Sequence, residues 1–471
     1  MESGRHVAAV GEAGEVGAVP RLLARLERLP FTRGHLTIAA ILGAGTFFDG
    51  FDSLIIASAV VAMVSTLHLG PASTGVLISS AYIGQIAGAL AFGSLSELVG
   101  RRPTFIASLV IFGLLSLATA AAWNFGSLFA FRVLQGIGLG AEVPIAGALF
   151  NEFVRGRTRG RVVLLYQTMF PWGIFIAPLA AAALYGLLGQ AVGWRVLFVI
   201  GGLALVVAAF AYWKLPESPR WLAEHGRPDQ AEKVVGSLEA SARRSGATLE
   251  EPRVDVRPAE ARTRFTELLS RQYRGRSLVS WTQWFTCYFV TYGLTTWLPT
   301  LYVTIGRLPV TASLLLAATS SGIGVIVVYL FALNTDRIGR KPFFVGGFSL
   351  AVLGAIFGAT MVAVQGRPSW PVLFIGALAM QLGVSFSNVG VYVYTPELFP
   401  TRMRVWATAF GSSWNRVGAV IAPILIGLLL AARLGIGSVF IMFGVASAVG
   451  GVVIALWGIE TKQRTLEELA R

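Results

Sequence analysis

The sequence predicts an all-α polytopic membrane protein, with twelve transmembrane helices in two pseudo-symmetric six-helix bundles. Charged residues make up only 13% of the 471-residue chain, about half the share that soluble domains carry. Apolar runs of about 20 residues, long enough to cross a bilayer, recur along nearly the whole chain. One long polar stretch separates six runs from six. With so few water-facing side chains, most of the surface must face lipid.

The apolar runs predict where each span lies. We expect spans at 36–62, 74–96, 103–123, 126–150, 161–185, 193–214, 277–303, 311–333, 341–363, 370–393, 402–430 and 436–458. These spans imply an N-terminal tail with an amphipathic segment (1–35), an N-terminal bundle (36–214), a central loop (215–276), a C-terminal bundle (277–458) and a C-terminal tail (459–471).

The positions of Lys and Arg predict the orientation. Of the 38 cationic residues, 32 fall in segments on one side of the predicted spans, and only Arg307, Arg367 and Arg433 fall on the other. Cytoplasmic loops carry such an excess of cations. We therefore expect both termini in the cytoplasm and the protein in the inner (plasma) membrane of a bacterium.

Several classes of function are disfavoured. The net charge of +14 comes from short clusters between apolar runs, so a nucleic-acid partner is not expected. The lone Cys287 excludes an intrachain disulfide and a cysteine-based metal site, and no G-x-x-x-x-G-K-[ST] motif occurs. We expect no cofactor, no metal and no enzymatic reaction. The first apolar run, from about Leu36, is too long for a signal peptide and is expected to remain as a span.

The tail before the first span has its own pattern. Residues 21–30 read RLLARLERLP, with leucines and arginines spaced as in an amphipathic helix at a membrane surface. A solvated basic tail fits the same residues, and both interpretations stay open.

Two loops repeat a motif at equivalent places in the halves. Residues 97–102 read ELVGRR and residues 336–341 read DRIGRK, an internal repeat typical of transporters built from two homologous bundles. The glycine allows a tight turn, and the charged groups can join neighbouring helix ends in one conformation and release them in another. We expect this cytoplasmic gating network to comprise Glu97, Arg101, Arg102, Glu152, Arg155, Asp336, Arg340, Glu397 and Arg404.

The doubled motif resembles the major facilitator superfamily, and further matches narrow the branch. PESPRWL at 216–222, RGR at 159–161 and PELFPTR at 396–402 resemble sugar porters and their organic-ion relatives. So does ETKQRTLEE at 460–468, with Gln463 where sugar porters usually carry glycine. The resemblance covers nearly the whole chain. It implies the major facilitator fold and alternating access, and we expect a monomer to be the functional unit.

The predicted seventh span departs from the sugar-porter pattern. It holds one glutamine, Gln283, among aromatic residues, where sugar porters usually have a glutamine pair and an asparagine. YGL at 292–294, WLP at 297–299 and FDGFD at 48–52 instead resemble bacterial metabolite:proton symporters, including aromatic-acid and nicotinate carriers. The resemblance therefore implies proton-coupled symport of a small organic anion.

Five ionisable residues stand well inside predicted spans: Asp49, Asp52, Arg132, Glu142 and Arg416. Each costs roughly 2.5–3.5 kcal/mol at a helix centre, so each is a functional candidate. Asp52 lies roughly 24 Å into span one and Arg132 roughly 9 Å into span four from the opposite side, so their depths agree. The resemblance implies that Asp52 carries the proton and that Arg132 gates it. A permanent structural ion pair is the alternative.

The other two acids have two interpretations each. Asp49, one turn before Asp52, either shares the proton or serves helix packing. Glu142 is a second protonation candidate, or it satisfies backbone groups freed by Pro144.

The remaining candidates predict a substrate site. Arg416 suits a carboxylate, because its planar fork binds one with two hydrogen bonds; the alternative is an ion pair with Asp49 or Glu142. Aromatic residues in span seven recur at three- and four-residue spacing and predict a wall for a flat ring, or ordinary packing. These are Trp281, Trp284, Tyr288 and Tyr292. Gln167, Gln283 and Asn388 are candidates to orient the substrate.

Other functions stay open at this point. A sugar or polyol symporter is favoured if the polar groups of spans seven and ten converge, and a drug/proton antiporter is a further alternative. A non-transporting receptor is disfavoured by Asp52 and Arg132, and a channel by the doubled gating motif. The expected partners are a small-molecule substrate, protons and the lipid bilayer.

Overall fold

The computed structural model describes residues 18–462, apart from 68, 156–165, 253–264 and 367. Long helices account for most of this length, and the expected all-α membrane fold is confirmed. The N-terminal half contains α2 (Arg33–Thr66), α3 (Pro71–Val99), α4 (Arg101–Ala120), α5 (Phe125–Phe153), α7 (Met169–Leu188), α8 (Gln190–Gly201) and α9 (Ala204–Lys214). The C-terminal half contains α12 (Arg274–Thr304), α13 (Val310–Ile338), α14 (Arg340–Gln365), α15 (Trp370–Glu397), α16 (Arg404–Ala431) and α17 (Gly435–Trp457).

Eleven stretches of the described chain are long and apolar enough to cross a membrane, with α8 and α9 together forming one of them. The twelfth long helix, α12, falls outside that set because Thr, Ser, Gln and Arg lower its hydropathy. It is also the most enclosed helix of its half, with Trp284, Cys287 and Val290 fully buried. A helix surrounded by other helices does not need the apolar surface that lipid demands.

Small residues let helices of one half approach closely. A methyl group at Gly84 of α3 would lie 1.9 Å from the Val133 carbonyl oxygen, and one at Gly140 of α5 would lie 2.2 Å from the Gln85 carbonyl oxygen. Both distances are far below contact range, so only glycine permits this α3–α5 packing. Interfaces between membrane helices use small residues in this way.

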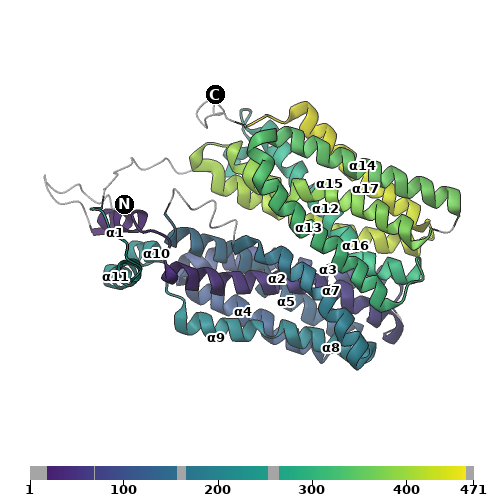
Figure 1. Cartoon of the computed structure of the whole chain (residues 1–471), viewed down its shortest axis with the longest axis horizontal. Coiled ribbons are helices and arrows are strands. Elements are labelled where there is room, and N and C mark those ends of the chain that lie inside the picture. Colours follow the sequence, from purple (N-terminus) through teal and green to yellow (C-terminus); the bar gives the residue numbers. More distant parts are fainter. Residues whose placement is uncertain (1–17, 68, 156–165, 253–264, 367, 463–471) are drawn as a thin grey trace, which may run out of the picture.

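The two halves lie side by side, the N-terminal half below and the C-terminal half above in Figure 1. The most extensive contacts between them are those of α3 with α16, α7 with α13, and α2 with α12. The ribbons of the halves converge toward the right of this view and diverge toward the left.

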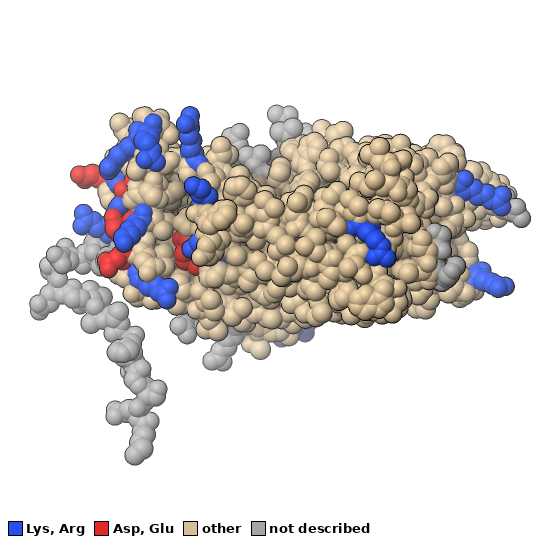
Figure 2. Space-filling view, turned by 90° about the horizontal axis from the view of Figure 1, so that it is seen from below, with Lys and Arg blue, Asp and Glu red and all other residues tan. Residues whose placement is uncertain are grey.

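The two ends of the molecule differ in charge. Figure 2 shows Lys, Arg, Asp and Glu gathered at one end, and only a few blue residues toward the other end. The charged groups gather where α1 (Ala18–Glu27), α10 (Pro219–Glu224) and α11 (Pro228–Arg244) lie in Figure 1. We call the two ends the charge-rich end and the charge-poor end. The α3–α16 contact lies toward the charge-poor end, since it joins the first turns of α3, at Pro71 and Gly75, to Pro423 and Gly427 of α16. Ser79 also donates a hydrogen bond to the Val420 carbonyl at 2.8 Å.

The repeated Gly-Arg motif has the same geometry in both halves. Gly100 and Gly339 adopt left-handed φ values of 115° and 104°, a region that favours glycine. Each precedes a helix whose first backbone N–H groups donate to a carboxylate. Glu217 accepts from Arg101 and Arg102 at 3.1 Å, and Glu460 accepts from Arg340 at 3.1 Å and Lys341 at 3.0 Å.

The amphipathic tail segment forms α1 (Ala18–Glu27), and its apolar face packs on protein. The buried residues Leu22, Leu26 and Leu29 share a core with α11 (Pro228–Arg244) of the central loop. Arg25 forms two hydrogen bonds with Glu239, at 2.9 and 2.8 Å, and Arg28 donates to the same carboxylate at 2.6 Å. These contacts differ from both sequence interpretations, because the leucine face is covered by α11.

Candidate functional site

Arg416 on α16 reaches from the C-terminal half into the N-terminal half. Its Nη2 donates to the Gly140 carbonyl of α5 at 3.2 Å, and its Nη1 donates to the Ser412 carbonyl at a long 3.4 Å. Its Nε has no hydrogen-bond partner within the described part of the chain. The side chain is only half-buried. A guanidinium has five N–H donors, so Arg416 retains donors and accessible surface for an anion.

Asp52 and Arg132 form a closed, buried unit with Gln135. Arg132 Nη1 donates to both carboxylate oxygens of Asp52, at 2.9 and 2.8 Å, and to the Gln135 side-chain oxygen at 2.8 Å. The Gln135 amide in turn donates to Asp52 at 2.8 Å. Asp52 is fully buried and Arg132 is 1% exposed, so the two charges compensate each other without water. Arg132 Nε has no hydrogen-bond partner among the described residues.

Asp49 and Glu142 are buried without such compensation. Glu142 accepts one hydrogen bond from Thr46 at 3.1 Å, and its second oxygen has no partner among the described residues. The same is true of Asp49 Oδ1. The two carboxylates are close enough to interact electrostatically, and Arg416 acts on Asp49 in the same way. An unpaired buried carboxylate is costly when ionised, so these two groups are suited to holding a proton.

A column of aromatic rings crosses from one half to the other. Trp284 stacks on Tyr288, and Tyr288 on Tyr292, with ring centroids 5.8 and 5.7 Å apart. Tyr292 then meets Tyr82 of α3 in the other half at 4.9 Å. Tyr392 of α15 contacts the Trp284 ring edge-on at 4.7 Å. The span-seven stripe, Trp281 apart, thus forms a column that reaches the other half at Tyr292.

Three members of this arrangement were not expected from the sequence. Tyr82 and Tyr392 lie on helices for which hydropathy does not reveal which side faces the interface. Gln135 lies one helical turn after Arg132, which was the only signal that could have pointed to it. Arg416 and Asp49 both act electrostatically on Tyr292 and Tyr392, so the cation, the acid and these two rings belong to one site.

The remaining substrate-site candidates from the sequence do not all lie in the same part of the structure. Asn388 donates to Thr291 of α12 at 2.7 Å, and its side-chain oxygen has no partner in the described structure. Gln283 instead turns toward α17, where it donates to the Gly450 carbonyl at 3.0 Å. Gln167 is half-buried just before α7 begins. Trp281 faces α16, with its ring 4.8 Å from Phe410. The structure therefore does not bring Gln283 and Trp281 to the interface column.

The expected gating residues lie toward the charge-rich end, and three ion pairs among them each join residues of the same half. Arg101 pairs with Glu97 at 2.9 Å and approaches Glu152 at 3.6 Å. Arg340 pairs with Glu397 at 2.9 Å in the other half. The remaining members take other positions: Arg102 donates to the Tyr212 carbonyl, Arg404 donates to the Phe399 carbonyl at 3.2 Å, Arg155 follows the end of α5, and the Asp336 side chain lies outside the described residues.

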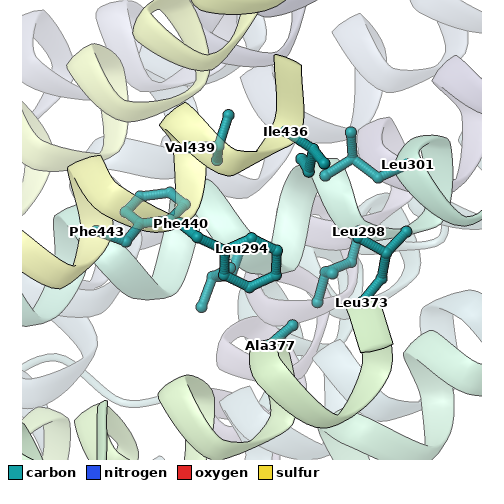
Figure 3. A pocket seen from close by; sticks show the side chains of 9 residues that line it. All are labelled: Leu294, Leu298, Leu301, Leu373, Ala377, Ile436, Val439, Phe440 and Phe443. Carbon is teal, nitrogen blue, oxygen red and sulfur yellow. The ribbon is translucent and has the colours of Figure 1, made fainter. Parts of the chain in front are cut away.

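A small pocket lies elsewhere in the C-terminal half, between α12, α15 and α17 (Figure 3). Its lining is entirely apolar: Leu294, Leu298, Leu301, Leu373, Ala377, Ile436, Val439, Phe440 and Phe443. Without a polar group to orient a solute, it does not suit an ionic substrate. Within the described residues, no three His, Cys, Asp or Glu side chains gather closely enough to hold a metal ion.

Comparison with known proteins gives consistent results. A family model described as "Sugar (and other) transporter" matches residues 36–471. The chain is 32% identical over 462 residues to the niacin transporter NiaP of Acinetobacter baylyi, covering 95% of this chain and 99% of that protein. It is 29% identical to the 4-hydroxybenzoate transporter PcaK of the same organism, covering 90% and 91% of the two chains.

Solved structures support the fold. An inward-open structure of the xylose transporter XylE from E. coli superposes with a TM-score of 0.73 at 19% identity, covering 92% of this chain and 99% of that chain. At this identity the likeness shows the fold alone.

Proposed function

Because this chain belongs to the sugar (and other) transporter family of the major facilitator superfamily, we propose that it is a proton-coupled symporter of a small organic anion. An aromatic or heteroaromatic carboxylate is the favoured substrate. Secondary transport of small organic acids is supported by its relatives, and niacin and 4-hydroxybenzoate, named for two of them, are aromatic acids. The halves would expose the site alternately to either side of the membrane.

Arg416 is the observation that carries the proposal. It is a cation between the two halves, with an uncommitted Nε among the described residues and weak backbone contacts. A carboxylate would supply the acceptors that the protein does not, and the bidentate geometry of the guanidinium suits it. Tyr292 and Tyr392 stand in the same electrostatic neighbourhood, and the aromatic column offers a flat ring a stacking surface.

Proton coupling is proposed to use Asp49, Asp52, Glu142 and Arg132. The Asp52–Arg132 pair is closed in this conformation, so Asp52 can serve as the carrier only if Arg132 moves away in another state. Such a movement would take the guanidinium away from Asp52 and leave its carboxylate open to a proton. Asp49 and Glu142 each have one carboxylate oxygen without a hydrogen-bond partner among the described residues, so both are further candidates to carry the proton.

A sugar or polyol substrate is less well supported. Hydroxyl recognition by spans seven and ten would need Gln283 and Asn388 to converge. Gln283 instead binds the Gly450 carbonyl of α17, whereas Asn388 binds Thr291. That separation favours the anion.

The same proposal includes topology. We place the charge-rich end in the cytoplasm because cytoplasmic loops hold most cations, with both termini there and the protein in the inner membrane. The expected gating residues would then join the halves at the cytoplasmic end when the transporter opens outward. The monomer, with its complete set of two halves, is the proposed transport unit.

Uptake by proteoliposomes tests this function. Purified protein should accumulate nicotinate or 4-hydroxybenzoate when the interior is alkaline, and Arg416→Gln should weaken the apparent affinity roughly 10- to 100-fold, which corresponds to about 1.5–3 kcal/mol for hydrogen bonds to a charged group. Arg433→Gln, which removes an exposed arginine near the charge-poor end, is the matched control and should leave uptake unchanged. Normal carboxylate affinity in Arg416→Gln would contradict the substrate site, and accumulation of xylose in place of the acids would favour the sugar alternative.

A further inference from the structure

The further inference concerns how proton and anion are linked, and it rests on the proposed function. Asp49 and Arg416 come from different halves, yet both lie beside α5: Arg416 donates to the Gly140 carbonyl, and Thr46, one turn before Asp49, donates to Glu142. Neither is saturated: Asp49 Oδ1 and Arg416 Nε both lack a hydrogen-bond partner among the described residues. Asp49 is 6% exposed, so water compensates its charge poorly.

The backbone geometry explains why these two groups meet. Thr46 and Asp49 lie three residues apart on α2 and share a face of that helix. Thr46 contacts Glu142 of α5 at 3.1 Å. Arg416 binds the carbonyl of Gly140, two residues before Glu142. One turn of α2, one turn of α5 and the Arg416 guanidinium therefore form a single cluster between the halves.

The other charged and titratable groups around Asp49 do not compensate it. Asp52 on the same helix is bound by Arg132 and Gln135 of α5, and its charge repels that of Asp49. Glu142 is a further acid. The hydroxyls that face the cluster are those of Tyr82 on α3, Tyr292 on α12 and Tyr392 on α15. Arg416 of α16 is the cation whose charge reaches Asp49.

We propose that Asp49 and the substrate carboxylate compete for Arg416, so that the anion binds tightly only when Asp49 carries a proton. With Asp49 ionised, the bound anion would be the second negative charge beside one guanidinium in a poorly hydrated site, where like charges repel strongly. With Asp49 protonated, the guanidinium and the anion form a neutral pair. The proton comes from solution onto the Asp49 carboxylate, and no bond other than O–H forms or breaks.

This arrangement couples the binding of the anion to a proton on Asp49. An empty site retains the Asp49–Arg416 attraction, and a loaded site holds both the proton and the anion. Binding of the anion without a proton is disfavoured. Leakage of the anion without proton transport is therefore disfavoured as well. Because linkage is reciprocal, a bound anion must also tighten the binding of the proton.

Calorimetric titration of purified transporter tests the linkage. The probes are nicotinate and 4-hydroxybenzoate, titrated in two buffers of different ionisation heat between about pH 6 and about pH 8. The wild type should take up about one proton per anion, and its Kd should rise by roughly tenfold per pH unit above the titration of Asp49. Asp49→Asn should bind the anion with a proton uptake near zero and with a Kd that changes less than about twofold over the same range.

Two further variants make the result specific. Asp49→Glu keeps a titratable group and should keep the proton uptake. If Asp49→Asn does not give a folded protein by size-exclusion and thermal unfolding, Asp49→Ser carries the same expectation.

The outcomes separate the two ideas. Failure of the wild type to bind either acid would refute the proposed function. Binding without proton uptake, or uptake that persists in Asp49→Asn and disappears in Glu142→Gln, would overturn the competition while leaving anion binding intact. Uptake that disappears in Asp52→Asn and persists in Asp49→Asn would also overturn it.

Discussion

The contact between α3 and α16 makes a sharp prediction about the conformational equilibrium. A Cβ added to Gly427 would lie 2.5 Å from the Pro71 carbonyl oxygen, and one added to Gly75 would lie 2.4 Å from the Pro423 carbonyl oxygen. Ordinary close contacts between carbon and oxygen are about 3.3 Å. Gly427→Ala therefore requires the two helices to separate by about 0.8 Å, the difference between these distances. That separation weakens the closure of the charge-poor end.

The size of the effect follows from overpacking energies. Inserting a methyl group into a tight contact costs about 1–3 kcal/mol. A state in which the halves part at this end escapes that cost. The equilibrium should therefore shift toward the open state by roughly 5- to 150-fold. The open fraction sets the rate at which a buried reporter reacts.

Ser79 provides the reporter, because it is fully buried at this contact and donates to Val420. The chain has a single cysteine, Cys287, so Cys287→Ser with Ser79→Cys leaves one reactive site. A membrane-impermeant maleimide should label this site faster after Gly427→Ala, within the range above. Gly324→Ala, where nothing lies within 4 Å of the added methyl, should leave the rate unchanged. Equal labelling rates in Gly427→Ala and its parent would refute the reasoning.

Three further predictions test other parts of the molecule. Asp52→Asn should abolish proton-driven accumulation while leaving substrate exchange, because Asn cannot carry a proton; intact accumulation would refute the carrier role. Asp52→Asn alone leaves the Arg132 charge buried without a partner, which costs about 3–5 kcal/mol. The double variant Asp52→Asn/Arg132→Gln removes that charge and so distinguishes loss of the proton carrier from misfolding. Hydrogen bonds from Arg25 and then Arg28 lower the pKa of Glu239 from 4.5 to about 2. The ionised Glu239 therefore adds to the free energy of unfolding above pH 4.5, and this stabilisation is lost as pH falls toward 2. After discounting for solvent, Glu239→Gln should cost about 1 kcal/mol near neutral pH, and thermal unfolding should show that the difference narrows in acid. Glu217→Gln should lower stability by about 1 kcal/mol, because its carboxylate faces the N-terminus of α4. Glu460→Gln should behave alike, and unfolding midpoints identical to wild type would contradict the capping role.

The sequence predicted the fold well because the bilayer imposes a strong rule. Backbone groups in lipid must be satisfied within a helix, so apolar runs of sufficient length mark the spans directly. Hydropathy is weakest in α12, yet its apolar run still marked a span at 277–303. The repeated Gly-Arg motif likewise predicted two equivalent turns, and both adopt left-handed φ values.

The site was less accessible from sequence. Matching depth predicted that Asp52 and Arg132 can meet, and the structure pairs them at 2.8 Å. Depth says nothing about rotation around a helix axis, however. Gln283 and Trp284 are adjacent in sequence, yet Gln283 points to α17 while Trp284 stacks with Tyr288. Tyr82 and Tyr392 join the column from helices distant in sequence.

The N-terminal segment shows the same limit outside the spans. Its leucine spacing predicted an amphipathic helix, and that helix forms. Periodicity identifies an apolar face but not what covers it. In the structure α11 covers this face, and its Glu239 forms ion pairs with Arg25 and Arg28.

The sequence by itself determined the number of spans, the charge difference between the two ends and the set of ionisable groups inside the membrane. Those properties depend on local composition, which hydropathy and charge record. Tertiary structure decided which of these groups are compensated. Asp52 is closed off by Arg132 and Gln135, whereas Asp49 Oδ1 and Arg416 Nε, in opposite halves, have no hydrogen-bond partner among the described residues. The physical reason is that lipid and helix interiors are similarly apolar, so the rotation of each helix is set by close packing at glycines such as Gly84 and Gly140.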